Sequence, residues 1–136
     1  RDALLAIPNG EARPVSELTK ADFSHVCILQ PYQNRVQADH GELDLARANA
    51  HLSAIEYAGD EGRWALILIA DAAIELVVFN RSSKLDLMAV QQLQSTDAAA
   101  LLPIGFVPMN SAAGNRAALS KIGFGERTYV VLGEVS

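Results

Sequence analysis

The clearest pattern of apolar and polar positions predicts one long amphipathic helix. Its apolar positions recur at steps of three and four residues, as Leu45, Ala48, Leu52 and Ile55. This spacing places them on one face of a helix. Asp39 and Glu42 have the spacing of a capping box at its start, and Gly59 supplies a left-handed stop at its end. We therefore expect a helix from Gly41 to Ala58, packed on a sheet.

Shorter apolar runs, rich in branched and aromatic side chains, predict strands. They are Phe23–Gln30, Trp64–Ala70, Ile74–Asn80, Ile104–Met109 and Thr128–Gly133. The first run is apolar on both of its faces, which indicates an interior strand. The second and third runs are separated by a connection so short that they must pair as an antiparallel hairpin. Pro108 in the fourth run fits a strand at a sheet edge.

The remaining segments complete the predicted fold. We expect residues 1–22 to be an irregular lead-in holding one short helix, and residues 110–115 to be a loop. Further short helices are expected at Leu85–Leu93, after Asp97, and at Arg116–Ile122. The chain is then a single α+β domain over residues 1–136. Its largely antiparallel sheet of about five strands packs with one main amphipathic helix and shorter helices.

The charge of the chain is concentrated in one segment. The 136 residues are 50% hydrophobic and carry a net charge of −5, which suits one globular domain. The segment from Asp39 to Gly62 holds six acids and one base, and acids and bases balance in the rest of the chain. An acidic chain without clustered Lys and Arg is not expected to bind nucleic acid.

Helix electrostatics divides these acids into two groups. Asp39, Glu42 and Asp44 lie in the predicted first turn, where the helix dipole favours negative charge. Glu56, Asp60 and Glu61 lie at or beyond its C-terminal end, where the dipole disfavours negative charge. One interpretation is a solvated turn partly neutralised by Arg63. The other is a surface that attracts a basic partner.

A second candidate for recognition is the polar loop of residues 31–37. It holds Tyr32 and Arg35, which are residue types enriched in protein interfaces. The predicted partner-binding residues are therefore Glu56, Asp60, Glu61, Tyr32 and Arg35.

Cysteine and histidine offer an alternative chemistry. Cys27 is the only cysteine, so no disulfide forms within the chain. His25 lies two residues earlier on the same strand face, an arrangement that a thiol enzyme could use, although a lone cysteine in an apolar strand is more typical of a core. Neither His40 nor His51 has metal-ligand spacing, and no phosphate-binding or hydrolase motif is found. We expect no metal and no cofactor.

These observations favour a small non-enzymatic domain that binds another protein. We expect an inhibitor or immunity-type factor, of bacterial type, whose partner is a basic or secreted enzyme. One alternative is an enzyme or redox protein centred on Cys27 and His25. Another is a small-ligand carrier with an apolar pocket between the sheet and the helix. The longest uncharged apolar run, Trp64–Ala70, is too short to span a membrane. We expect a soluble protein, either cytoplasmic or periplasmic after removal of a signal.

Overall fold

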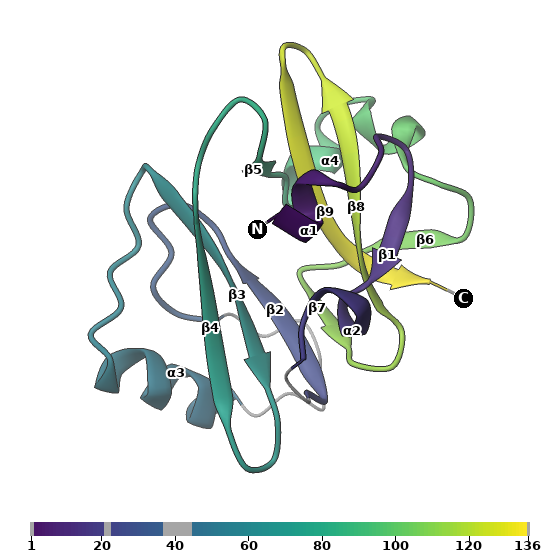
Figure 1. Cartoon of the computed structure of the whole chain (residues 1–136). Coiled ribbons are helices and arrows are strands. Elements are labelled where there is room, and N and C mark those ends of the chain that lie inside the picture. Colours follow the sequence, from purple (N-terminus) through teal and green to yellow (C-terminus); the bar gives the residue numbers. More distant parts are fainter. Residues whose placement is uncertain (1, 21–22, 37–44, 136) are drawn as a thin grey trace.

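Two sheets dominate the structure, which we describe from a computed structural model over residues 2–20, 23–36 and 45–135 (Figure 1). The helices in these ranges are α1 (Asp2–Leu5), α2 (Val15–Leu18), α3 (Leu45–Ala54), α4 (Val90–Gln94) and the 3₁₀ helix η1 (Ala98–Leu101). The strands are β1 (Ala12–Pro14), β2 (His25–Leu29), β3 (Arg63–Ile69), β4 (Ile74–Asn80), β5 (Asp86–Leu87), β6 (Phe106–Pro108), β7 (Ser111–Ala113), β8 (Ala117–Phe124) and β9 (Arg127–Val135). None of the helices in these ranges is both long and apolar enough to cross a membrane.

The strands pair almost entirely in antiparallel fashion. The first sheet has the order β4-β3-β2-β7, and the second has the order β1-β8-β9-β5 with β6 also paired to β9. The single parallel pairing in the described chain joins β5 to β9. The predicted α+β class with a largely antiparallel sheet is confirmed. So is the hairpin of β3 and β4, in which Arg63 lies opposite Asn80 and Ile69 opposite Ile74.

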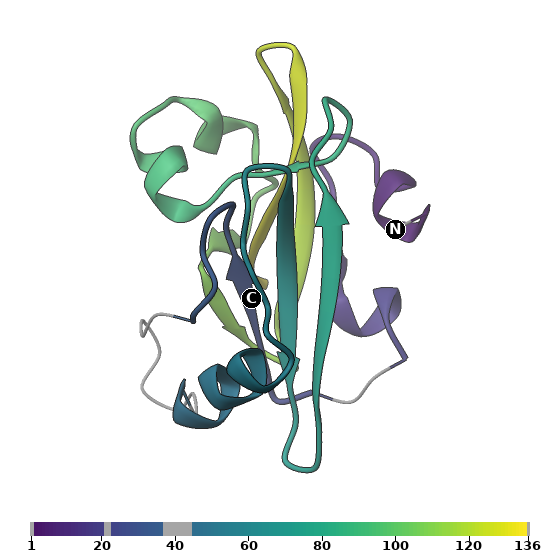
Figure 2. The ribbon, with the colours of Figure 1, turned by 90° about the vertical axis from the view of Figure 1, so that its left-hand side faces the viewer.

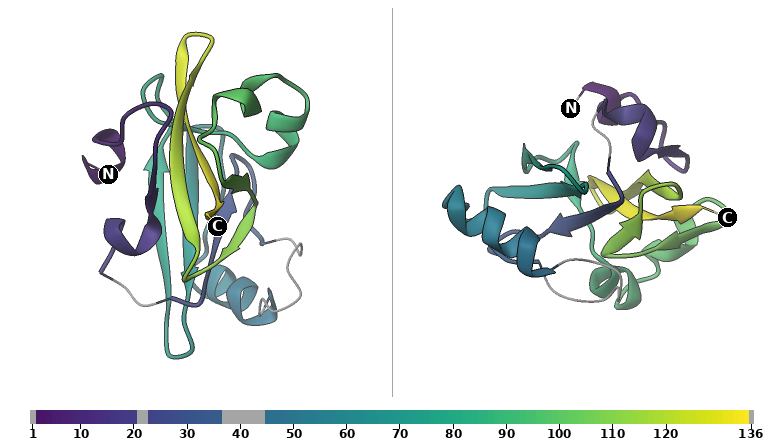
Figure 3. Two further views of the ribbon diagram at one scale, coloured as in Figure 1. Left: turned by 90° about the vertical axis from the view of Figure 1, so that its right-hand side faces the viewer. Right: turned by 90° about the horizontal axis from the view of Figure 1, so that it is seen from below.

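Two sheets face each other across the main core, to which α1 and α2 contribute Leu4 and Val15. α3 covers the outer face of the first sheet, and α4 and η1 cover that of the second (Figures 2 and 3). Between the sheets, buried Trp64 stacks on Phe79 with ring centroids 4.4 Å apart, beside buried Leu119. On the other face of the first sheet, α3 packs its buried Leu52 against residues of β2 and β3. A third cluster joins α4 and η1 to the second sheet, including buried Leu93. β2 is interior, as predicted, because both of its faces are covered.

Residues 2–20 hold more regular structure than expected. Besides the one short helix predicted there, which is α2, they form α1 and β1, and β1 pairs with β8. Lys121 on β8 is buried, and its Nζ donates a hydrogen bond to the carbonyl oxygen of Leu5 at 2.9 Å. Burial lowers the pKa of Lys121. This contact holds α1 against the second sheet.

Several predicted elements are wrong, and pairing with distant strands explains why. The described chain has nine strands rather than about five. Residues 116–122, predicted as a helix, lie mostly in β8, and residues 110–115, predicted as a loop, contain β7. Residues 85–93 begin with β5 before α4 starts. The alanines and leucine of β8 favour a helix locally, but pairing with β1 and β9 buries both faces of this segment.

Candidate functional site

The main helix ends in a left-handed residue that is not glycine. α3 spans Leu45–Ala54, and the predicted capping box of Asp39 and Glu42 lies outside the described residues. Beyond Ala54, the N–H of Glu56 bonds to the carbonyl of Ser53 at 3.1 Å, and the N–H of Tyr57 bonds to that of Leu52 at 3.0 Å. This pair of bonds is a Schellman motif, and Glu56 occupies its left-handed position with φ 56°. The stop is therefore Glu56, and the prediction that Gly59 ends the helix is wrong.

Gly59 instead allows two loops to touch. These are the loop of residues 30–36 after β2 and the loop of residues 55–62 before β3. A Cβ atom at Gly59 would lie 2.5 Å from the carbonyl oxygen of Gln33, so only glycine fits there without movement. The N–H of Tyr32 bonds to the carbonyl of Asp60 at 3.2 Å. The two recognition segments predicted separately from the sequence thus lie side by side.

Tyr32 is the most exposed aromatic residue of this pair of loops. The residue is 68% exposed, and its backbone is left-handed with φ 68°. Its hydroxyl donates to the Glu61 Oε2 at 3.2 Å. Partial desolvation and the charge of the Glu61 carboxylate both raise the pKa of Tyr32.

The charges at this site are mixed rather than uniformly acidic. An ion pair joins the Asp60 Oδ2 to Arg63 at 3.0 Å, and the Asp60 Oδ1 accepts the N–H of Gly62. Within the described chain, no ion pair neutralises the exposed Glu56. Arg35, on the facing loop, is also exposed. A pair as exposed as that of Asp60 and Arg63 contributes little stability, about 0–1 kcal/mol.

A buried carboxylate fixes the base of the second loop. Asp86 on β5 is 1% exposed and binds Arg81 at 2.9 Å and Arg127 at 3.0 Å. The Nη1 atom of Arg81 also donates to the backbone carbonyl of Glu61 at 3.0 Å. Asp86 and its two arginines thus link the end of β4 in the first sheet to β5 and β9 in the second. It thereby anchors the loop that carries Asp60 and Glu61 to the rigid core.

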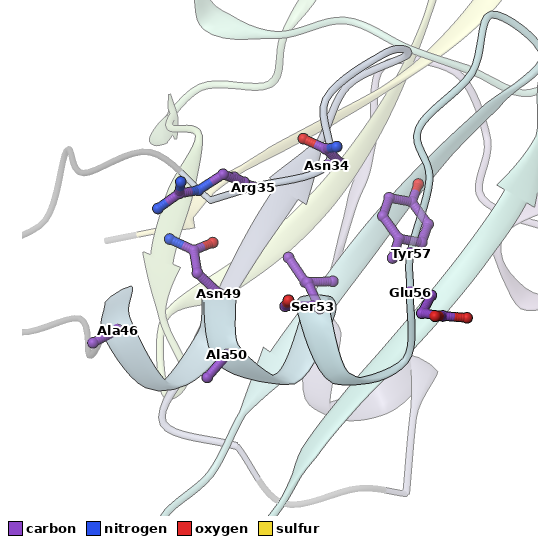
Figure 4. Close-up of a pocket in the computed structure, with 9 residues that line it drawn as sticks. Asn34, Arg35, Ala46, Asn49, Ala50, Ser53, Glu56 and Tyr57 are labelled. Carbon is purple, nitrogen blue, oxygen red and sulfur yellow. The ribbon is translucent and has the colours of Figure 1, made fainter.

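A groove of about 610 Å³ runs between the first loop and α3. Its lining comprises Asn34, Arg35, Ala46, Asn49, Ala50, Leu52, Ser53, Glu56 and Tyr57. Asn49 holds the two sides together, because its side-chain amide bonds to both the N–H and the carbonyl of Val36, at 2.7 and 3.2 Å. Figure 4 shows Arg35 above the helix at one side of the groove and the Glu56 carboxylate pointing away from it at the other. The groove thus has a cationic group at one end, and at the other end the negative charge of Glu56 is directed outward.

The sequence pattern did not identify Asn49 and Tyr57 as residues of this groove. Asn49 gave a weak signal, because asparagine is a poor helix former unless its amide has a partner. Tyr57 gave none. Its hydroxyl is buried and has no hydrogen-bond partner within the described chain, and burial raises its pKa. Its burial depends on the Schellman turn, which places its ring against the core beneath α3.

The alternative chemical candidates lie elsewhere. Cys27 is 1% exposed in the core between α3 and the first sheet. His25 lies at the start of the same strand, with its Nδ1 3.2 Å from the Ser24 hydroxyl. His51 is on α3, and His40 lies outside the described residues. In the ranges 2–20, 23–36 and 45–135, no group of three or more His, Cys, Asp or Glu side chains could hold a metal ion.

The fold therefore brings all five predicted partner-binding residues to adjoining segments. We call them the two-loop surface: Tyr32, Arg35, Glu56, Asp60 and Glu61. Tyr32 and Glu61 are joined by a hydrogen bond, and Arg35 and Glu56 line the same groove. No family model, no curated protein and no solved structure matches this chain.

Proposed function

We propose that this chain is a small protein-binding domain that holds a partner protein at the two-loop surface, without catalysing a reaction. The proposed role is that of an inhibitor or immunity-type factor acting on a basic or secreted enzyme. The partner would cover Tyr32 and place basic groups near Glu56 and Glu61. An acidic group of the partner would meet Arg35.

The observation that carries the proposal is backbone strain at this surface. Among the described residues, Tyr32 and Glu56 are the non-glycine residues with positive φ, at 68° and 56°. A left-handed conformation disfavours such residues by about 1–2 kcal/mol. Residues in such disfavoured conformations persist only where the surrounding structure enforces them, and they cluster at functional sites. Glycine at either position would remove the strain, but it would also remove an exposed side chain.

The surface chemistry supports a protein partner more than a small ligand. The groove is open and its lining is mostly polar or small, while the space between α3 and the first sheet is filled by core side chains such as Leu29 and Leu52. An exposed tyrosine beside charged groups is typical of interface hot spots. The rigid anchors at Asn49 and Asp86 hold both loops in place, so that binding would require little ordering of the described loops.

Charge reversal tests the proposal. The triple variant Glu56→Lys, Asp60→Lys, Glu61→Lys and the wild type are immobilised, and captured proteins are compared at low and physiological salt. The matched control reverses three exposed acids elsewhere: Asp71, Asp97 and Glu126. We expect at least one protein that wild type and control retain and the triple variant loses, with capture that weakens as salt increases. Identical capture by all three chains would contradict the proposal.

A further inference from the structure

β4 is an edge strand of the first sheet, and within the described residues no strand pairs with its outer side. β4 lies at the end of the strand order, and Figure 2 shows it with the purple α1 and α2 beside it, on the side away from α3. The N–H of Ala70 bonds to the carbonyl of Ala73, and the N–H of Arg81 bonds to that of Gly62. Both pairs share the register of β3 and β4.

This register fixes which backbone groups of β4 point outward. Because bonded and non-bonded pairs alternate in an antiparallel ladder, the odd-numbered residues of β4 bond to β3. The even-numbered residues, Ile74, Leu76, Val78 and Asn80, therefore direct their N–H and carbonyl groups away from the sheet. No backbone hydrogen bond joins these four to the described chain. The strand has no proline and no bulge to protect this edge.

An apolar cavity lies beside the same strand. It has a volume of about 170 Å³ between α1, α2 and the face of β3 and β4. Its lining comprises Ala3, Leu4, Val15, Leu18, Thr19, Leu66, Leu68, Val77, Phe79 and Leu119. A dry cavity of about 150 Å³ can accommodate benzene, so this one has room for a single large apolar side chain.

We propose that β4 is a strand-addition site for an extended segment of a partner protein. Hydrogen bonds to the outward backbone groups of β4 would provide affinity, and the cavity would select an apolar side chain opposite Val77. Glu75 is exposed on the same face as Val77, so it favours a basic residue directly across from it. In an antiparallel arrangement, the segment has apolar residues opposite Phe79 and Val77 and Lys or Arg opposite Glu75. This site does not depend on the two-loop surface.

A synthetic peptide tests the proposal on the whole chain. The probe is Thr-Leu-Thr-Leu-Thr-Lys-Thr, and the readout is amide hydrogen exchange with NMR chemical shifts. We expect the amides of Leu76 and Val78 to exchange quickly in the free chain and to be protected when the peptide binds. Replacing the central leucine of the peptide by serine should weaken binding at least tenfold. Protection that appears only in residues 30–36 and 55–62, or no binding at millimolar peptide, would overturn the proposal.

Variants of the edge supply the controls. Val78→Pro removes an outward N–H without removing a bond to β3, and Val78→Ala keeps that N–H. We expect Val78→Pro to bind the peptide about tenfold more weakly than Val78→Ala, and Glu75→Lys to bind about threefold more weakly than wild type. Circular dichroism checks that each variant is folded. The triple variant at Glu56, Asp60 and Glu61 should bind the peptide normally, which separates this site from the proposed function. Equal binding by the proline and alanine variants would refute the strand-addition geometry.

Discussion

Replacing Glu56 by glycine should stabilise the fold while removing part of the two-loop surface. Glu56 sits at the left-handed position of the Schellman motif with φ 56°. Relief of the left-handed conformation is worth about 1–2 kcal/mol, and removal of a negative charge from a helix C-terminus adds about 0.3–1 kcal/mol. The greater freedom of glycine in the unfolded chain offsets about 0.5–1 kcal/mol. We expect Glu56→Gly to raise the free energy of unfolding by about 1 kcal/mol.

Urea denaturation followed by circular dichroism measures this gain, which corresponds to a rise in Tm of about 4 °C. Two variants separate its causes. Glu56→Gln keeps the strain and removes the charge, so it should gain only about 0.3–1 kcal/mol. Ala58→Gly adds glycine where φ is not left-handed and should lose about 0.5 kcal/mol. If Glu56→Gly is no more stable than wild type, the interpretation of Glu56 as a strained functional residue fails.

Three further predictions follow from buried contacts. Asp86→Ala leaves Arg81 and Arg127 without their buried carboxylate and should lower the free energy of unfolding by about 3 kcal/mol, measured by guanidinium denaturation; a loss below about 1 kcal/mol would contradict this role. Gly59→Ala forces a Cβ atom against the Gln33 carbonyl and should lower the free energy of unfolding by about 1–3 kcal/mol in the same measurement. In Gly62→Ala the added Cβ atom makes only ordinary contacts, so the free energy of unfolding should change little. Equal losses in the two variants would refute the close packing of the loops. Cys27, at 1% exposure, should react with a thiol reagent only as fast as the fold opens, and rapid labelling of the folded chain would contradict its buried position.

Local patterns predicted the elements that follow from their own apolar period or from a short connection. The stripe of Leu45, Ala48 and Leu52 predicted α3, because its burial repeats with the helical period. The short connection between β3 and β4 predicted their hairpin. The apolar faces of β2 predicted its interior position.

Elements that depend on distant pairing were not predictable from local pattern. β8 has a helical composition and becomes a strand because β9 on one side and β1 on the other supply its hydrogen bonds. β7 is made of small residues and forms because it pairs with β2, more than 80 positions earlier in the chain. The geometry of the two-loop surface was likewise not predictable from local pattern. The contact of Tyr32 with Glu61, and the left-handed turn at Glu56, follow from how α3 returns the chain to β3.

Site-specific photo-crosslinking from position 32 tests the central claim most directly. Benzoylphenylalanine replaces Tyr32 in one variant and Ile104, which is fully exposed in the turn between η1 and β6, in the control. The partner found by differential capture is then mixed with each variant and irradiated. If the two-loop surface binds that partner, position 32 crosslinks to it and position 104 does not, and the triple charge reversal abolishes the product. Crosslinking from position 104 alone would contradict the account.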